Sequence, residues 1–340
     1  MSHPYKNLPE RAFWKPAVGT KSPFDISDLW QPKFDIEKQH KWVTFGSCFA
    51  QHLSRAIQAN GFKWFNAEPA PQWLDDKIKT AFNYGVYSAR TGNIYTTTLL
   101  LQWLKWALEE EPVPEEVWEQ GERFFDPFRP VIEPTGFCSR DEVLASRRET
   151  IEAFKACMTQ ANYFVFTMGL TERWLHKSGY EYPMCPGTAA GNFDESEHIF
   201  ESLKFSQIKD ALAEVIERVK QVNPGIKVIL TVSPVPLTAT QTDDHVLVAT
   251  MRSKSTLRAV AAEIKDEFDC VDYFPSYEII NSAPYKGMFF EPNQRSVNPN
   301  GVAWVMKQFF AGQQLVESKE GEPVDEVCEE AILEAFSKHD

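Results

Sequence analysis

The sequence contains no long uninterrupted apolar run. No stretch approaches the 18 or more apolar residues of a membrane-spanning helix, and none follows Met1 as in a secretory signal. We therefore expect a cytoplasmic protein without a membrane span. The six cysteines are widely spaced and form no Cys-x-x-Cys pair, which favours reduced thiols over a disulfide framework or a zinc site.

Clusters of positive charge are also absent from the sequence. Lysine and arginine number 35 against 48 aspartates and glutamates, which gives a formal charge of −13. Because nucleic acids and anionic lipids are bound through clustered basic side chains, this balance argues against either as the main partner. With 340 residues, 43% of them hydrophobic, the chain can bury a sizeable core.

Strand-like and helix-like segments alternate along most of the chain. Residues 163–168 and 227–232 are nearly continuous apolar runs, the pattern of buried parallel strands. The sequence predicts strands at 41–45, 63–66, 163–168, 227–232 and 270–274, and helices at 51–59, 96–110, 141–159, 205–222, 253–268 and 301–310. This alternation predicts a three-layer α/β/α fold around a doubly wound parallel sheet of about five strands.

Three segments fall outside this alternation. Residues 1–40 are rich in proline and aromatic residues without clear periodicity, so we expect an irregular N-terminal arm. Residues 111–140, rich in proline, predict an inserted excursion within a domain that spans 41–310. Residues 311–340 form an acidic tail with one weakly amphipathic segment, Val327–Phe336.

A serine stands where the first strand meets the first helix. The apolar run Trp42–Phe45 ends at Gly46-Ser47, and helix-like spacing begins directly afterwards. This pattern can hold a serine hydroxyl at the carboxyl edge of a parallel sheet, where ligands bind in open α/β folds. N–H groups at the helix start can stabilise an oxyanion there. The alternative is that Ser47 only caps the helix.

Polar residues also follow the strand predicted at 163–168. Gly169, Thr171 and Glu172 come directly after it. Because the carboxyl ends of parallel strands share one edge of the sheet, we expect Glu172 within reach of Ser47.

The segment Gly46-Ser47-Cys48-Phe49-Ala50 spells the motif for which the GSCFA family is named, and other segments resemble that family in the same order. They lie at residues 83–86, 92–96, 169–172, 231–235 and 253–255. The resemblance runs from about Trp42 to about Phe310. It implies an SGNH-hydrolase-like, flavodoxin-like fold from a superfamily of hydrolases and acyltransferases, with Ser47 at the nucleophile position.

The resemblance also implies an oxyanion site beside the nucleophile. Gly85 would donate its N–H together with that of Ser47, and Asn83 would line the pocket. Gly169 fits the third block of the SGNH pattern. Thr171, however, stands where that pattern has asparagine, so its hydroxyl would be the substitute donor.

The Asp-x-x-His pair of the SGNH pattern is missing. Asn293 and Ser296 occupy the places of the acid and the histidine, and neither is a base at neutral pH. His245, which has aspartates beside it and follows a predicted strand, is one candidate base, expected to face Ser47 directly or through one water. Glu172 is the other, if burial raises its pKa.

These residues predict acyl-ester chemistry on a small-molecule or carbohydrate ester, by hydrolysis or by transfer of an O-acyl group through a serine ester. No metal or organic cofactor is implied, and acyl-CoA would enter only as a donor in a transfer reaction. The competing hypothesis is a catalytically inactive SGNH-like module that binds a glycan or a protein partner. Oligomeric state has no signal in the sequence.

Overall fold

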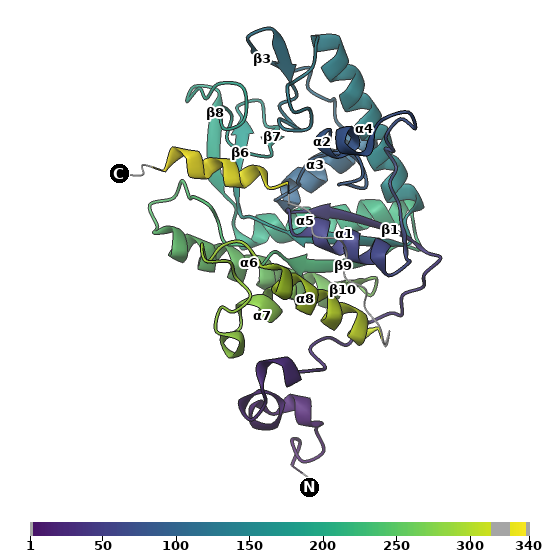
Figure 1. Ribbon diagram of the computed structural model, residues 1–340, viewed down its shortest axis with the longest axis vertical. Helices are drawn as coiled ribbons and strands as arrows, with labels where there is room; N and C mark the ends of the chain where they lie inside the picture. Colours follow the sequence, from purple (N-terminus) through teal and green to yellow (C-terminus); the bar gives the residue numbers. More distant parts are fainter. Residues whose placement is uncertain (1–2, 314–326, 338–340) are drawn as a thin grey trace.

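A five-stranded sheet forms the centre of the protein, in a computed structural model that describes residues 3–313 and 327–337. The strand order is β10-β9-β5-β1-β2, and each neighbouring pair is parallel. The strands are β1 (Lys41–Gly46), β2 (Lys63–Trp64), β5 (Tyr163–Met168), β9 (Lys227–Val232) and β10 (Val271–Tyr273). Helices cover both faces (Figure 1), so the predicted three-layer α/β fold is confirmed.

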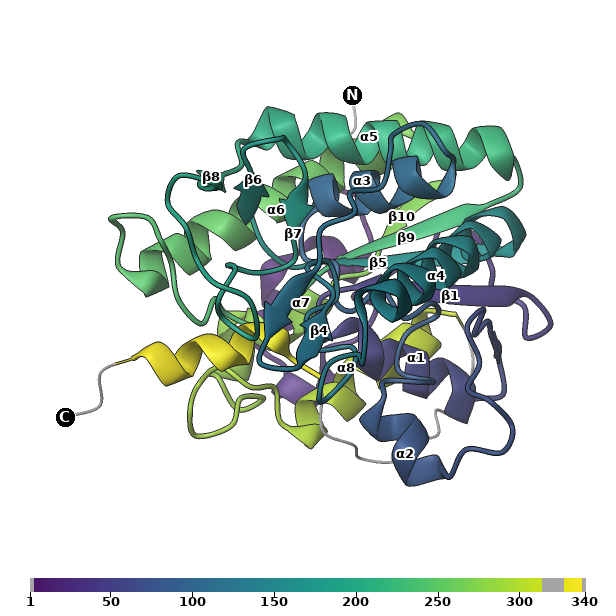
Figure 2. The ribbon, with the colours of Figure 1, turned by 90° about the horizontal axis from the view of Figure 1, so that it is seen from above.

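The two faces of the sheet bury different side chains, because successive residues of a strand point to opposite sides. Val43 and Phe45 belong to one apolar cluster and Trp42 to the other. Helices α3 (Thr97–Ala107), α4 (Arg140–Gln160), α5 (Phe205–Val222) and α6 (Val246–Glu267) pack on the first, and α1 (Ala50–Ala59), α7 (Ser276–Asn281) and α8 (Pro299–Gly312) on the second. Figure 2 shows α3 and α5 on one side of the strands and α1 and α8 on the other.

Helix α6 begins at Val246, well before the start predicted at residue 253. His245 is its N-cap residue, and the imidazole Nδ1 accepts a hydrogen bond from the Leu247 N–H at 3.2 Å. Capping by a histidine therefore extends the helix into a stretch that lacks clear apolar spacing.

Two small antiparallel units were not predicted. Strand β6 (Glu172–His176) pairs with β7 (Glu181–Tyr182) and β8 (His198–Ser202). Strands β3 (Trp118–Gln120) and β4 (Arg123–Phe125) form a hairpin within 111–140, and α2 (Asp76–Ala81) lies before α3. Because β6 leaves the end of β5 through Gly169–Thr171, its sheet extends from the carboxyl edge of the central sheet.

The N-terminal arm consists of short helical turns that extend away from the sheet (Figure 1). They are η1 (Glu10–Ala12), η2 (Lys15–Gly19) and η3 (Pro23–Asp25), while a further turn, η4 (Ala283–Tyr285), precedes α8. Trp14 is 71% exposed, whereas Trp30 is buried and its indole N–H donates to Asp272 at 3.2 Å. The arm is thus anchored through its C-terminal part.

The amphipathic segment of the acidic tail forms a short helix, η5 (Glu329–Phe336), drawn in yellow in Figure 1. Residues 314–326 and 338–340 of the predicted tail lie outside the described residues. Within residues 3–313 and 327–337, no helix combines the length and the apolar character needed to cross a membrane.

Candidate functional site

Ser47 follows a turn that requires glycine at the preceding position. Gly46 has φ +126°, and a Cβ on it would lie 2.2 Å from the Thr167 carbonyl oxygen. This close approach lets the Ser47 N–H donate to Thr167 O at 2.9 Å. The expected use of that N–H as an oxyanion donor therefore needs correction, because the sheet already engages it.

The Ser47 hydroxyl is buried and makes no hydrogen bond within the described part of the chain. The residue is 2% exposed, and its Oγ has no hydrogen-bond partner among the described residues. The alternative role as a helix cap is not realised either, since α1 has Phe49 at its N-cap and no side-chain cap. Buried hydroxyls are nearly always hydrogen-bonded. The Ser253 hydroxyl is unpaired in the same way, but Ser47 is distinguished by its position at the carboxyl edge of the sheet, where a ligand or a reaction partner can bind.

Gly169 contacts both Ser47 and the buried amine of Lys254. A Cβ on Gly169 would lie 3.1 Å from the Ser47 Cβ, so the two residues are in close contact. The Gly169 carbonyl accepts a hydrogen bond from the Lys254 Nζ at 2.7 Å. Lys254 lies within α6 and is 1% exposed, and burial lowers its pKa to about 8. Ser47 and a partly deprotonated amine therefore contact the same glycine.

Arg295 lies between Asn293 and Ser296, the positions where the Asp-x-x-His pair was expected. Its side chain is 12% exposed, and its Nη2 lies 3.4 Å from Glu330 Oε2. It also hydrogen-bonds the Cys328 thiol. A hydrogen bond with Cys48, together with the charge of Arg295, lowers the pKa of Cys328 to about 7. The C-terminal segment therefore contacts the residue directly after Ser47.

Two amides hold the start of the C-terminal segment. Gln51 Nε2 and Asn93 Nδ2 donate to the Val327 carbonyl at 2.9 and 2.8 Å, and the Val327 N–H donates back to Gln51 Oε1 at 3.1 Å. Since Gln51 lies in the first turn of α1, residues 327–330 cross the carboxyl edge of the sheet next to Ser47.

The Glu329 carboxylate is buried in a polar cradle. Asn93 hydrogen-bonds it through the side chain, at 3.3 Å, and through the backbone. A Cβ on Gly92 would lie 2.9 Å from Glu329 Oε1, so glycine is needed for this approach. Burial raises the pKa of Glu329 to about 8. At pH 7 most of this side chain is therefore the neutral acid, and the donors that bind its oxygen atoms can also bind an oxyanion.

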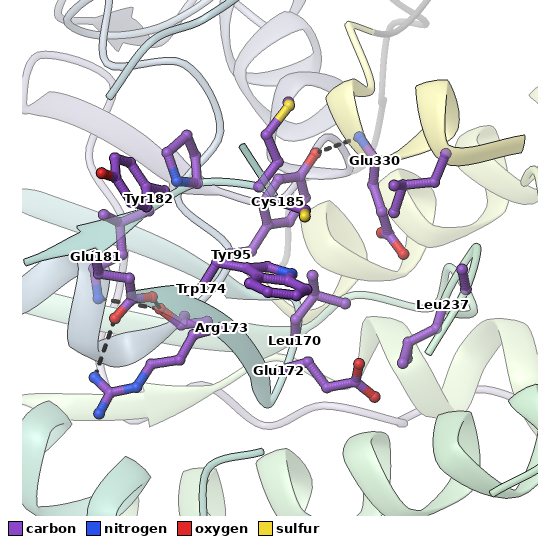
Figure 3. A pocket seen from close by; sticks show the side chains of 16 residues that line it. Tyr95, Leu170, Glu172, Arg173, Trp174, Glu181, Tyr182, Cys185, Leu237 and Glu330 are labelled. Carbon is purple, nitrogen blue, oxygen red and sulfur yellow. Dashed lines mark hydrogen bonds and ion pairs between the residues drawn. The ribbon is translucent and has the colours of Figure 1, made fainter. Parts of the chain in front are cut away.

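A pocket opens beside this segment (Figure 3). Its apolar wall includes Leu170, Trp174 and Leu237, and η5 contributes Glu330 and Leu333. Tyr95 also lines the pocket, and its carbonyl accepts hydrogen bonds from the Gly169 and Leu170 N–H groups. The pocket therefore adjoins the glycine that packs on Ser47.

Glu172 lines the pocket, as its position after β5 predicts. Its Oε1 accepts from the Thr240 hydroxyl at 2.6 Å, and its Oε2 accepts from the Gln241 N–H at 3.2 Å. Burial raises the pKa of Glu172. Ser47 does not line this pocket, so a shared site for the two side chains stays a prediction.

His245 is exposed and caps α6. Since Ser47 Oγ bonds to no described residue, the direct contact expected between these two side chains is absent. Gly85 is also exposed, with φ +75° and no atom within 4 Å of an added Cβ. Their catalytic and oxyanion roles stay predictions.

The remaining predicted residues are held by backbone contacts. Asn83 is buried with φ +60°, and its amide donates to the Val131 and Ile132 carbonyls at 3.1 and 3.2 Å, which ties its loop to the 111–140 segment. Thr171 is buried, and its carbonyl accepts from the Leu203 N–H. The Gly169 N–H donates to Tyr95 O.

Three residues of the site, Lys254, Cys328 and Glu330, were not predicted from the sequence. A lysine within a helix and acidic residues in a tail are ordinary surface features. For Lys254, the family-like segment at 253–255 was a signal that could have found it. Among the described residues, no group of three or more His, Cys, Asp or Glu could hold a metal ion.

The molecule is thus a three-layer α/β protein with a buried serine at the carboxyl edge of its parallel sheet. Residues 41–309 match the GSCFA family, and the chain belongs to that family. No curated protein and no solved structure matches it.

Proposed function

We propose that the protein is a serine-dependent acyl-ester hydrolase or O-acyltransferase that acts on a hydroxylated substrate, with a carbohydrate as the expected acyl carrier. The observation that carries this proposal is the environment of Ser47. Its hydroxyl is buried with no hydrogen-bond partner among the described residues, and its Cβ packs against Gly169, whose carbonyl accepts a hydrogen bond from the buried Lys254 amine. A serine needs such a neighbouring base to act as a nucleophile.

Lys254 is the base that we favour: its amine does not hydrogen-bond Ser47 Oγ in the described state, but both residues contact Gly169. With its pKa lowered to about 8, roughly one-tenth of the amine is neutral at pH 7 and can accept a proton. Lys254 would take the Ser47 proton while Oγ attacks the acyl carbonyl, and the ammonium would return that proton to the departing alcohol. Water or an acceptor hydroxyl would then cleave the serine ester. Glu172 and His245 stay the alternative bases.

Asn93 is our choice of oxyanion donor. Its side chain and its backbone now hold the Glu329 carboxyl group, whereas the N–H groups of Ser47 and Gly169 are engaged with backbone carbonyls. An oxyanion would take the place of this carboxyl group once the C-terminal segment moves. The apolar wall of the adjoining pocket would receive part of the substrate.

One observation favours a binding module as the second candidate. The C-terminal segment contacts Cys48 and Asn93, so the described state leaves Ser47 covered. A protein that uses this cleft only to hold a ligand or its own tail would show the same contacts.

Labelling with a fluorophosphonate probe, with the labelled residue located by mass spectrometry, tests the proposal. Ser47→Ala should abolish labelling. Ser253→Ala is a matched control, because Ser253 is also buried with no hydrogen bond from its hydroxyl to a described residue, and it should label normally. Failure of the wild type to label, or labelling of Ser47→Ala, would favour the binding module.

Turnover of an activated ester separates the bases. Lys254→Met should reduce turnover by about 10²–10⁴-fold, the usual contribution of a positioned base. Glu172→Gln and His245→Ala should leave it nearly intact. If either of these two variants shows the large loss and Lys254→Met does not, the base is that residue and our assignment is wrong.

A further inference from the structure

The chain places one of its own carboxylates in the site. Glu330 is 9% exposed, and its Oε1 accepts a hydrogen bond from the Thr238 backbone N–H at 2.7 Å. Its Oε2 lies 3.4 Å from Arg295 Nη2. The Glu330 N–H donates to the Tyr95 hydroxyl at 3.4 Å, a contact drawn in Figure 3. One carboxylate is therefore held by a backbone donor and faced by a guanidinium.

The Glu330 carboxylate leaves part of the hydrogen-bonding capacity of Arg295 unused. Its Nε and Nη2 are buried and make no hydrogen bond to any described residue. Charge-assisted bonds from arginine to a carboxylate are normally about 2.7–2.9 Å long and often paired, so a contact of 3.4 Å leaves donor capacity unspent. A buried guanidinium with spare donors is costly, and the planar fork fits a second, better-placed carboxylate.

We propose that Arg295 and the Thr238 N–H form a carboxylate-binding subsite near Ser47, which takes an acyl compound bearing a free carboxylate and which Glu330 fills until such a ligand displaces it. The choice of an acyl compound rests on the proposed function. The subsite itself depends only on the contacts of Arg295 and Thr238.

Displacement of Glu330 would also open the neighbouring space. Glu330 and Leu333, both on η5, line the pocket beside Tyr95. Glu329, the preceding residue, fills the Asn93 cradle. Since these three residues belong to one short segment, a ligand that takes the carboxylate subsite would free the cradle and the pocket wall together.

The Glu330 carboxylate competes with any added carboxylate for the subsite. A tethered group typically acts at an effective concentration in the millimolar range. An added carboxylate must therefore compete with Glu330, and its apparent affinity for the wild type should be weak. Removing the charge of Glu330 should remove most of this competition.

Calorimetry with the full chain and succinate tests the subsite, with uncharged succinamide as the paired probe. Glu330→Gln should bind succinate at least 10-fold more tightly than the wild type. Glu334→Gln, an exposed residue on the same helix, should behave as the wild type does. Adding Arg295→Gln to Glu330→Gln should return affinity to the wild-type level or below, and Arg295→Lys, which keeps the charge without the fork, should fall between.

Equal binding of succinamide and succinate, or unchanged affinity when Arg295→Gln or Arg295→Lys is added to Glu330→Gln, would overturn the subsite. Circular dichroism of each variant guards against misfolding, and Arg295→Lys carries the test if Arg295→Gln does not fold.

Two esters separate this proposal from the proposed function. Glu330→Gln should raise turnover of p-nitrophenyl hemisuccinate more than that of neutral p-nitrophenyl butyrate, by about the fold-change seen for succinate binding. Succinate binding without turnover or fluorophosphonate labelling would refute the acyl-ester function and leave the subsite standing. Turnover of both esters without succinate binding would refute the subsite alone.

Discussion

Two buried clusters of charged side chains differ in how completely their members are paired. In the first, Arg129 Nε and Arg147 Nη2 lie 2.8 and 2.9 Å from the two oxygens of Asp126, and all three side chains are almost fully buried. Arg129 also donates to the Thr150 and Ser146 hydroxyls. This network joins the 111–140 segment to α4.

The second cluster, at the carboxyl edge of the sheet, is only partly paired. Ser47 Oγ and two nitrogens of Arg295 make no hydrogen bond to a described residue, although they are buried. Buried polar groups that fold a protein are normally satisfied, so a paired network indicates a structural role. Unpaired atoms gathered around one serine indicate a site that awaits a ligand.

Removing Asp126 from the first cluster should destabilise the folded protein. Asp126→Asn leaves two buried guanidinium groups without their counter-charge, and breaking a buried pair in this way costs about 3–5 kcal/mol. Urea denaturation at pH 7 measures the loss in the free energy of unfolding. Glu109→Gln removes the acid of an exposed pair with Lys155 and should leave the free energy of unfolding nearly unchanged.

The same acid predicts loss of stability at low pH. Burial alone would raise the pKa of Asp126, but the charges of Arg147 and Arg129 outweigh it and lower that pKa. The stabilisation is therefore present at neutral pH and is lost as the pH falls below 3.8 and through the folded-state value. A stability difference between wild type and Asp126→Asn that stays the same as the pH falls from 7 to below 3.8 would contradict this account.

The buried amine of Lys254, beside the second cluster, has the opposite electrostatic effect at neutral pH, because burial disfavours its charged form. The pKa of Lys254 is near 8 in the folded protein and 10.5 ordinarily, so the unfolded chain binds more protons between these values and wild-type stability rises with pH. This difference is worth on the order of 3 kcal/mol. Lys254→Met abolishes that gain, so its stability relative to wild type should be greatest near pH 7 and fall toward pH 10.

Urea denaturation of both proteins at pH 7 and pH 10 measures this change. Lys209→Met provides the contrast, because ion pairs with Glu263 and Glu267 raise the pKa of that surface lysine. Its stability relative to wild type should therefore not fall between pH 7 and pH 10. A constant difference between Lys254→Met and wild type at the two pH values would show that the buried amine costs the fold nothing.

The central sheet could be predicted from the sequence because its strands carry their own signal. The apolar runs of β5 and β9 are long and are followed by turn residues, so the order of layers could be inferred. The sheet formed by β6, β7 and β8 escaped prediction because β6 pairs with a strand more than twenty residues away across irregular chain. Pairing of this kind depends on tertiary contacts.

The site was predictable only in part for a similar reason. Ser47 was visible because a strand, a turn and a helix meet at it. Lys254 and Glu330 gain their importance from contacts across the fold, one with Gly169 and the other with Thr238. His245 was attractive beside two aspartates, but its position is explained by capping of α6.

The reactivity of two partly buried thiols is the finest test, because Cys328 lies beside Arg295 of the second cluster and Cys185 lies in neither cluster. A hydrogen bond with Cys48 and the charge of Arg295 lower the pKa of Cys328 to about 7, whereas burial raises the pKa of Cys185 to about 11. At pH 7 the thiolate fractions differ by roughly 10⁴, and the weaker nucleophilicity of the less basic thiolate reduces the expected rate ratio to about 100. Alkylation with iodoacetamide, followed by peptide mass spectrometry, should therefore modify Cys328 about 100-fold faster. Arg295→Gln should slow Cys328 and leave Cys185 unchanged. Equal rates for the two thiols would mean that the C-terminal segment does not rest beside Arg295 in solution.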